Sequence, residues 1–201
     1  LLTTGAYSLF LALSPTAVPG SPHSSASPKD NKQRVTRLGL ALAAVVIGGA
    51  IGAIQYLPVM EYVPWSPRSG GKGYEYATSY SLPIEETINF YLPQFSGILD
   101  KYWGRNGIHF HSEYLGVVAL VLAGLGIGGG AANRNRRHGW FWLGAFVVSL
   151  LWALGGSTPF YQLIYALVPG TKYFRAPSTI LYVVGFSTAV LAAFGAERVS
   201  S

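Results

Sequence analysis

The 201-residue chain is 50% hydrophobic, only 11% charged, and carries a formal net charge of +6. A soluble domain usually carries about 25% charged residues, so this composition argues against an ordinary soluble protein. The basic residues lie in loops beside apolar segments and form no single stripe, which favours a membrane surface over nucleic acid as a partner. Cysteine is absent, which excludes disulfides, thiolate catalysis and cysteine metal sites.

The chain begins with two segments that do not cross a bilayer. Residues 1–14 are apolar, too short to span, and without the basic start of a signal peptide. We interpret them as the tail of a truncated transmembrane helix and expect the chain to be a fragment. Residues 15–37 are rich in Pro, Ser and charge, a composition typical of a flexible linker, and their lysines and arginines predict a cytoplasmic location.

Four uncharged apolar stretches follow, each long enough to cross a membrane. A helix with a rise of 1.5 Å per residue needs about 20 residues for one crossing. Because lipid offers no other way to satisfy the backbone of a spanning segment, all four are predicted helices. The predicted fold class is an all-α, multi-pass transmembrane helical bundle, with four full spans plus the truncated one. The spans are residues 38–58, 114–132, 139–156 and 178–196.

Glycines within two of these spans stand four residues apart, which places them on one helix face. Gly48 pairs with Gly52, and Gly124 pairs with Gly128. Small residues at this spacing let neighbouring helices approach closely, so we expect both faces to pack against other helices.

The positions of lysine and arginine predict the orientation. A basic cytoplasmic turn is predicted at residues 133–138, which contain three arginines, and Arg198 follows the last span. Cytoplasmic loops carry an excess of such residues. The loops at residues 59–113 and 157–177 are therefore expected to lie outside the cytoplasm.

The first outer loop, residues 59–113, is patterned enough to form a structured subdomain. Pro83 is expected to begin a helix at Ile84, with Glu85 and Glu86 in its first turn, where the helix dipole favours negative charge. Adjacent helical residues point about 100° apart, so these carboxylates are not expected to share a substrate. We expect apolar anchors at the membrane surface from Leu82, Tyr91, Phe95 and Trp103.

Three groups of residues in the outer loops are candidates for binding. Glu61 and Arg68 follow the first complete span at the expected depth of lipid headgroups, where Arg68 can hold a phosphate or act as an interfacial anchor. His109, His111 and Glu113 can share one face of either a strand or a helix, which suits a divalent cation, with interface packing as the alternative.

The third group lies in the second outer loop, residues 157–177. Its apolar stretch between Pro159 and Pro169 predicts a helix that lies in the membrane interface without crossing it. Lys172 and Arg175 follow among aromatic residues and suit an anionic lipid phosphate, with positive anchoring of the next span as the alternative.

Several separated segments resemble, in the same order, those of the bacterial YfhO-like membrane proteins, relatives of the GT-C class of polyprenol-dependent glycosyltransferases. They cover most of the chain after the predicted cytoplasmic linker, and their specificity lies in the combination. The segments are IQYLPVMEYV and SPR within 54–68, YATSYSLPIEETINFYLPQFSG at 76–97, YWG at 102–104, EYLG at 113–116, and LGGSTPFYQLIYALVPGTKYFRAPS at 154–178.

This resemblance implies a helical bundle in the bacterial plasma membrane that takes a sugar from a polyprenyl-phosphate donor and transfers it to a cell-envelope acceptor. Membrane lipids, the lipid-linked donor and an envelope polymer are the implied partners. Arg68 and Arg175 match arginines of the family motifs and are expected to be phosphate or structural contacts. GT-C enzymes usually carry their catalytic carboxylate in the first outer loop near the N-terminus, so we expect it upstream of Leu1 and assign that role to no residue here.

A non-catalytic membrane scaffold or a transporter component of the cell envelope is the alternative function. A transporter is expected to place ionisable groups in the middle of its spans, and the four predicted spans carry no charged residue there. A scaffold stays open. The sequence predicts no cofactor apart from a divalent cation at His109, His111 and Glu113.

Overall fold

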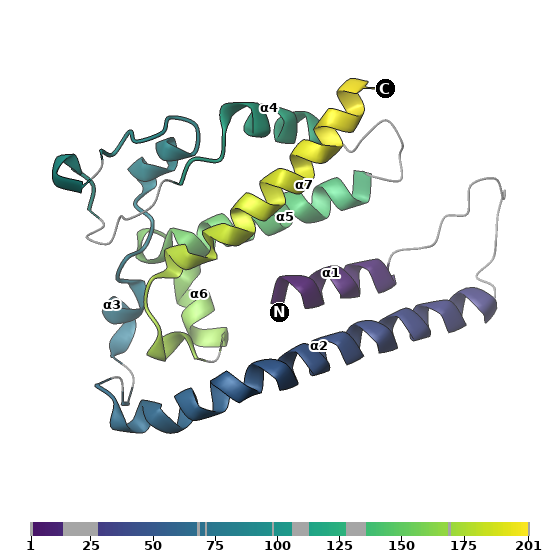
Figure 1. Ribbon diagram of the computed structural model, residues 1–201, viewed down its shortest axis with the longest axis horizontal. Coiled ribbons are helices and arrows are strands. Elements are labelled where there is room, and N and C mark those ends of the chain that lie inside the picture. Colours follow the sequence, from purple (N-terminus) through teal and green to yellow (C-terminus); the bar gives the residue numbers. More distant parts are fainter. Residues whose placement is uncertain are drawn as a thin grey trace. The chain divides into compact units, whose positions relative to one another are not determined.

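The computed structural model describes residues 2–13, 28–67, 69–70, 72–97, 99–105, 113–127, 136–168 and 170–200 (Figure 1). Within these ranges the regular structure is entirely helical, without any β-strand, which confirms the predicted all-α class. The chain divides into two compact units, residues 1–67 and residues 68–201.

The described residues of the first unit form two α-helices and a short 3₁₀ turn. Helix α1 (Leu2–Leu13) packs against α2 (Pro28–Tyr62), which ends in η1 (Val63–Trp65). With 35 residues, α2 is about 50 Å long at 1.5 Å per residue. Its apolar part, Val35–Trp65, is long and apolar enough to cross a membrane, and none of it is buried inside the protein.

The bounds of α2 correct the predicted division of this region. The linker was expected to extend through residue 37, yet α2 begins at Pro28 and is already helical there. Proline suits the first turn of a helix because its missing N–H has no intrahelical partner there, and no glycine or proline follows until Gly39. The helix also continues past Pro58 to Tyr62, because long apolar helices tolerate the loss of a single amide donor. Residues 15–27 of the predicted linker lie outside the described residues.

The second unit contains the longer helices α4 (Val117–Gly126), α5 (Arg136–Ala153) and α7 (Leu181–Ser200), together with the shorter helices α3 (Gly73–Thr78) and α6 (Phe160–Leu167). Helix α7 packs along both α4 and α5, as Figure 1 shows. Short 3₁₀ segments lie between these helices. They are η2 (Ile84–Phe90), η3 (Leu99–Lys101), η4 (Gly155–Ser157), η5 (Thr171–Tyr173) and η6 (Pro177–Ile180).

Of the three spans predicted after residue 59, one meets the length and composition for a crossing within the described residues. The segment Pro177–Ser200, formed by η6 and α7, is long and apolar enough. Helix α4 has 10 described residues, and α5 begins with Arg136, Arg137 and His138, which were expected in the basic turn. Residues 128–135, including Gly128 and the first half of that turn, lie outside the described part of the chain.

The packing of α7 follows a single stripe of side chains. The buried positions recur at one face of the helix because 3.6 residues make one turn. Trp142 of α5 contacts Phe186 of α7, with ring centroids 5.2 Å apart. The buried residues of α7 are Val183, Val184, Ser187, Thr188, Leu191 and Gly195.

Two glycines allow the backbones of α4 and α7 to touch. A Cβ atom at Gly126 would collide with the carbonyl oxygen of Leu191, and one at Gly195 would collide with the carbonyl oxygen of Leu122. The expected close approach of helices is therefore present, but at different residues. A Cβ atom added at Gly124 or Gly52, which were predicted to serve this purpose, would meet no neighbouring atom within 4 Å.

The segment after α3 joins the core of the second unit. The Leu82 amide donates to the carbonyl of Ala153 at 2.8 Å, and Leu82 is fully buried in a cluster with Phe90, Ala153 and Leu154. Leu82 is thus a core residue, which corrects its expected role as a membrane-surface anchor. The three aromatic residues predicted for that role, Tyr91, Phe95 and Trp103, are exposed.

Candidate functional site

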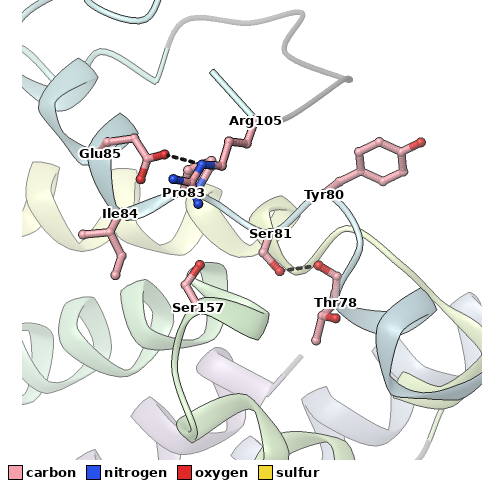
Figure 2. A pocket seen from close by; sticks show the side chains of 8 residues that line it. All are labelled: Thr78, Tyr80, Ser81, Pro83, Ile84, Glu85, Arg105 and Ser157. Carbon is pink, nitrogen blue, oxygen red and sulfur yellow. Dashed lines mark hydrogen bonds and ion pairs between the residues drawn. The ribbon is translucent and has the colours of Figure 1, made fainter. Parts of the chain in front are cut away.

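The candidate site is an open pocket of about 410 Å³ in the second unit. It lies where the segment between α3 and η2 passes over η4, and Figure 2 shows its side chains. Half of the lining residues carry a hydroxyl group, and one ion pair lies at the edge. The lining residues are Thr78, Tyr80, Ser81, Pro83, Ile84, Glu85, Arg105 and Ser157.

The floor of the pocket is held by hydrogen bonds between segments far apart in the sequence. Ser81 donates its hydroxyl to the carbonyl of Thr78 and accepts the Gly156 amide at 3.1 Å. Gly155 has a positive φ of 48°, and a Cβ there would collide with Ser81. Glycine is the residue that tolerates both this backbone and this approach.

Two non-glycine residues with left-handed backbones lie next to each other at the rim. Tyr80 has φ 61° and Ala176 has φ 65°, a conformation uncommon for residues with a Cβ. The Ala176 amide donates to the Ser79 carbonyl at 2.9 Å, and the Ser178 hydroxyl donates to the Tyr80 carbonyl at 2.8 Å. Strained backbone of this kind persists where surrounding contacts enforce it, and it clusters at functional sites.

These two bonds place Arg175 against the aromatic ring that lines the pocket. The guanidinium carbon lies 5.0 Å from the ring centroid of Tyr80 and 5.9 Å from that of Tyr76. Among the described residues, no carboxylate pairs with Arg175, whose side chain is exposed. Stacking on aromatic rings restricts a guanidinium while its N–H edge stays available for an anion.

Lys172 lies on the same loop and also over an aromatic ring. Its Nζ atom is 5.8 Å from the ring centroid of Tyr165 in α6. Tyr165 in turn packs edge-on against Tyr74 of α3, with centroids 5.5 Å apart. Lys172 and Arg175 are thus both oriented by aromatic residues of α3, α6 and the pocket rim.

The edge of the pocket carries the ion pair of Glu85 and Arg105. The Arg105 Nε lies 3.2 Å from Glu85 Oε1, with the arginine side chain 86% exposed and the glutamate 35% exposed (Figure 2). Pairs this exposed contribute little to stability, so the interaction mainly positions two charges at the opening.

Behind the pocket, a set of polar side chains is buried under η2. The Asn89 amide donates to the Ser96 hydroxyl at 2.8 Å and accepts the Ser96 backbone N–H at 3.2 Å. The Tyr102 hydroxyl donates to Oε1 of Glu86, a glutamate with no exposed surface. As expected from a helical turn, Glu85 and Glu86 point to different places, one at the pocket and one in this interior.

Glu113 joins this buried region from the segment that leads into α4. Its side chain is 8% exposed, and its Oε2 atom is buried without a hydrogen-bond partner among the described residues. Burial, and secondarily the charge of Glu86, raises the pKa of Glu113 from 4.5 to about 7. The carboxyl group is therefore poised between its two protonation states near neutral pH.

Of the residues that the sequence proposed for binding, the structure brings Lys172 and Arg175 together. Lys172 and Arg175 share one loop beside the pocket, while Glu113 lies in the buried region behind η2. Glu61 is exposed on α2, in the other compact unit. Arg68, His109 and His111 lie outside the described residues. Within the described ranges, no group of three or more His, Asp or Glu side chains is placed to hold a metal ion.

Sequence reasoning missed most of the pocket. Tyr80, Ser81 and Ser157 lie in two of the segments that resemble the YfhO-like family, but nothing in those segments indicates that they meet across residues 78 to 157. The neighbouring positions of Glu85 and Glu86 likewise could not reveal that one lines the pocket and the other is buried.

Comparisons with known proteins give no relative for this chain. No family model, curated protein or solved structure matches it. The similarity to the YfhO-like family therefore stays a prediction from the residues themselves.

Proposed function

We propose that this chain belongs to a multi-pass protein of the bacterial plasma membrane that binds a lipid-linked sugar at its extracytoplasmic side, in the manner of a GT-C glycosyltransferase. The observation that carries the proposal is the stacking of Arg175 on Tyr80, which places a cation beside a pocket lined with hydroxyl groups. The predicted multi-pass bundle and the predicted orientation are part of the proposal.

The chemistry of the pocket suits a phosphorylated sugar. Hydroxyl groups and carboxylates form hydrogen bonds with sugar hydroxyls, and the pocket offers Ser157 and Glu85 for this purpose. The hydroxyls of Thr78 and Ser81 donate to backbone carbonyls, so each can act towards a ligand only as an acceptor. A guanidinium binds phosphate oxygens through paired N–H donors, which Arg175 can offer at its free edge. One ligand with a sugar next to a phosphate would satisfy both features.

The polyprenyl chain of such a donor requires an apolar environment. In this proposal the lipid chain lies along the segment Pro177–Ser200 of the same unit, which has the length and composition of a membrane span. This segment begins two residues after Arg175, so a phosphate bound there would lie close to the end of an apolar helical segment.

The reaction implied is transfer of the sugar to an acceptor hydroxyl. The acceptor oxygen forms a bond to the anomeric carbon, the bond from that carbon to the phosphate oxygen breaks, and polyprenyl phosphate leaves with the electron pair. A carboxylate takes the proton of the acceptor hydroxyl. We assign this chain to donor binding and assign the role of the base to no residue in it.

Binding to the chain in lipid nanodiscs tests this assignment. The probes are a polyprenyl-phosphate sugar, the polyprenyl phosphate without a sugar, and the free sugar phosphate. We expect Arg175→Gln to weaken binding of the first about tenfold to a hundredfold, because a hydrogen bond to a charged group contributes about 1.5–3 kcal/mol. Arg175→Lys should recover only part of this loss, since lysine lacks the planar fork.

Lys101→Gln is the matched control, because Lys101 is an exposed cation on η3 that does not line the pocket. Its binding should equal that of the unaltered chain. Equal affinity of Arg175→Gln and Lys101→Gln, or the absence of any donor binding, would sink the proposal and favour the scaffold.

A further inference from the structure

Two exposed aromatic residues, Phe95 and Trp103, form a fixed pair on the segment between η2 and the edge of the pocket. Their ring centroids lie 5.5 Å apart with an interplanar angle of 78°, and both side chains are exposed. The Trp103 indole N–H donates to the Phe95 carbonyl at 3.1 Å, which fixes the orientation of the indole. These two residues are called the aromatic platform below.

One buried residue, Ser96, holds both members of the platform in place. Ser96 has no exposed surface, and the Asn89 side chain bonds to its hydroxyl at 2.8 Å and to its backbone N–H at 3.2 Å. Phe95 precedes Ser96 in the chain, and the Trp103 amide donates to the Ser96 carbonyl at 3.1 Å. An aromatic surface that is already fixed loses little conformational entropy when it binds a ligand.

The platform lies beside the pocket. Trp103 is two residues before Arg105, so their Cα atoms are at most about 7 Å apart. A Cβ atom at Gly104 would collide with the Tyr102 ring, so the chain between them is closely packed. Arg105 lines the pocket and pairs with Glu85 at 3.2 Å (Figure 2). A ligand that rests on Trp103 is therefore next to the opening of the proposed donor site.

An aromatic platform with polar neighbours suits a sugar ring. The face of an aromatic ring carries partial negative charge, which attracts the C–H groups on the apolar face of a pyranose. Gln94 and Asp100 are exposed on the same segment, one directly before Phe95 and the other three residues before Trp103. Their amide and carboxylate groups can form hydrogen bonds with the hydroxyls around such a ring.

A lipid surface is the alternative occupant, because the sequence predicts membrane anchors at these two aromatic residues. Tryptophan at a membrane surface usually keeps its N–H in the wet headgroup region, whereas the N–H of Trp103 is bonded inside the protein. Asp100 and Arg105 are exposed on either side of Trp103 in the sequence, and charged groups are costly to insert into lipid. Both observations favour a ligand that approaches from water.

We propose that the aromatic platform binds a sugar ring of the acceptor, and that the acceptor is therefore a glycan chain. This inference rests on the proposed function and adds acceptor binding to donor binding. A ring held on the platform brings a neighbouring hydroxyl of the same glycan toward the pocket, where positioning favours transfer. Phe95 and Trp103 act by binding, and the transfer step is the one described above.

Binding of soluble hexasaccharides to the chain in nanodiscs, measured by calorimetry without donor, tests the platform. The probes are maltohexaose, cellohexaose and chitohexaose, and we expect at least one of them to bind. Trp103→Leu should weaken this binding about tenfold, because leucine retains an apolar side chain but offers no aromatic face. Trp103→Phe should retain most of the affinity, since it keeps a ring for stacking.

Trp140→Leu is the matched control, because Trp140 on α5 is 56% exposed, the same fraction as Trp103. Its affinity for the hexasaccharide should equal that of the unaltered chain. Equal affinity of Trp103→Leu and Trp140→Leu, or the absence of binding by all three probes, would overturn the proposal. Saturation-transfer NMR of the unaltered chain requires no variant to fold. It should show transfer from aromatic protons to the C–H protons of the bound sugar, and its absence would also contradict the proposal.

A single spin label tests whether the membrane occupies this surface instead. The chain contains no cysteine, so Leu99→Cys provides one labelling site on the exposed segment between Phe95 and Trp103. We expect a water-soluble nickel complex to reach the label more readily than oxygen dissolved in lipid does. Preferential access of oxygen would place the segment in the bilayer and overturn the proposal.

Hexasaccharide binding and donor binding are measured separately. Hexasaccharide binding without any binding of a lipid-linked sugar would retain the platform as a glycan site and overturn the proposed function, and with it the role of acceptor. Donor binding without hexasaccharide binding would retain the proposed function and overturn the platform.

Discussion

The contact between α4 and α7 allows a sharp test, because two glycines on the same helix differ in their surroundings. At Gly126 an added Cβ would lie 2.9 Å from the Gly195 amide nitrogen and collide with the Leu191 carbonyl oxygen, whereas at Gly124 it would meet no atom within 4 Å. Alanine at either position favours the helix by about 0.5–1 kcal/mol over glycine. Only at Gly126 must the two helix backbones separate.

Overpacking of this kind costs about 1–3 kcal/mol. We expect a cost in the upper half of this range for Gly126→Ala, because the backbone atoms of α7 cannot rotate away as a side chain can. Gly126→Ala should therefore unfold at least about 1 kcal/mol more easily than the unaltered chain, and Gly124→Ala should be equal or slightly more stable. Reversible unfolding in detergent, followed by circular dichroism, measures both. Equal stability of the two alanine variants would refute the backbone contact between α4 and α7.

Further predictions concern the buried polar region behind the pocket. The unfolding free energy of the unaltered chain should fall by about 2.5 kcal/mol between pH 5 and pH 8, because burial raises the pKa of Glu113 from 4.5 to about 7 and the folded state holds its proton to higher pH. Glu113→Gln should abolish this fall, and chemical denaturation at the two pH values measures it. Asn89→Leu should cost about 1–3 kcal/mol by leaving polar groups of Ser96 buried without partners, and thermal unfolding tests it against the unaltered chain. Tyr102→Phe should destabilise by a similar amount, because the buried carboxyl group of Glu86 loses its donor; an unchanged melting temperature would contradict the bond.

Local sequence patterns were sufficient where one segment decides its own structure. The helix start at Ile84 after Pro83 is confirmed as the 3₁₀ segment η2, as is a short helix between Pro159 and Pro169, observed as α6. Both depend on proline and on a short apolar period, which act within a few residues. The bounds of α2 were wrong by a few residues at its end and more at its start, since charged residues extend a helix as readily as they form a linker.

The packing glycines show the limit of spacing arguments. Gly124 and Gly126 are both compatible with a small-residue face, and the choice between them depends on how α4 is rotated against α7. That rotation results from contacts along both helices and from the packing of α7 on α5, where Trp142 contacts Phe186. The sequence of a single segment therefore does not determine it.

Composition and the spacing of apolar residues were enough to predict a helical chain with segments able to cross a membrane. The reason is that the length and hydropathy of a segment depend only on its own residues. The interfacial role of Arg175 stays a prediction, which a cation among aromatic residues suggests by residue type alone. The pocket and the burial of Glu86 and Glu113 could not be predicted in this way. Ser81 meets Gly156, and Glu86 is placed within range of the charge of Glu113, through contacts between distant segments, and burial in the folded chain is what raises the pKa of Glu113 to about 7.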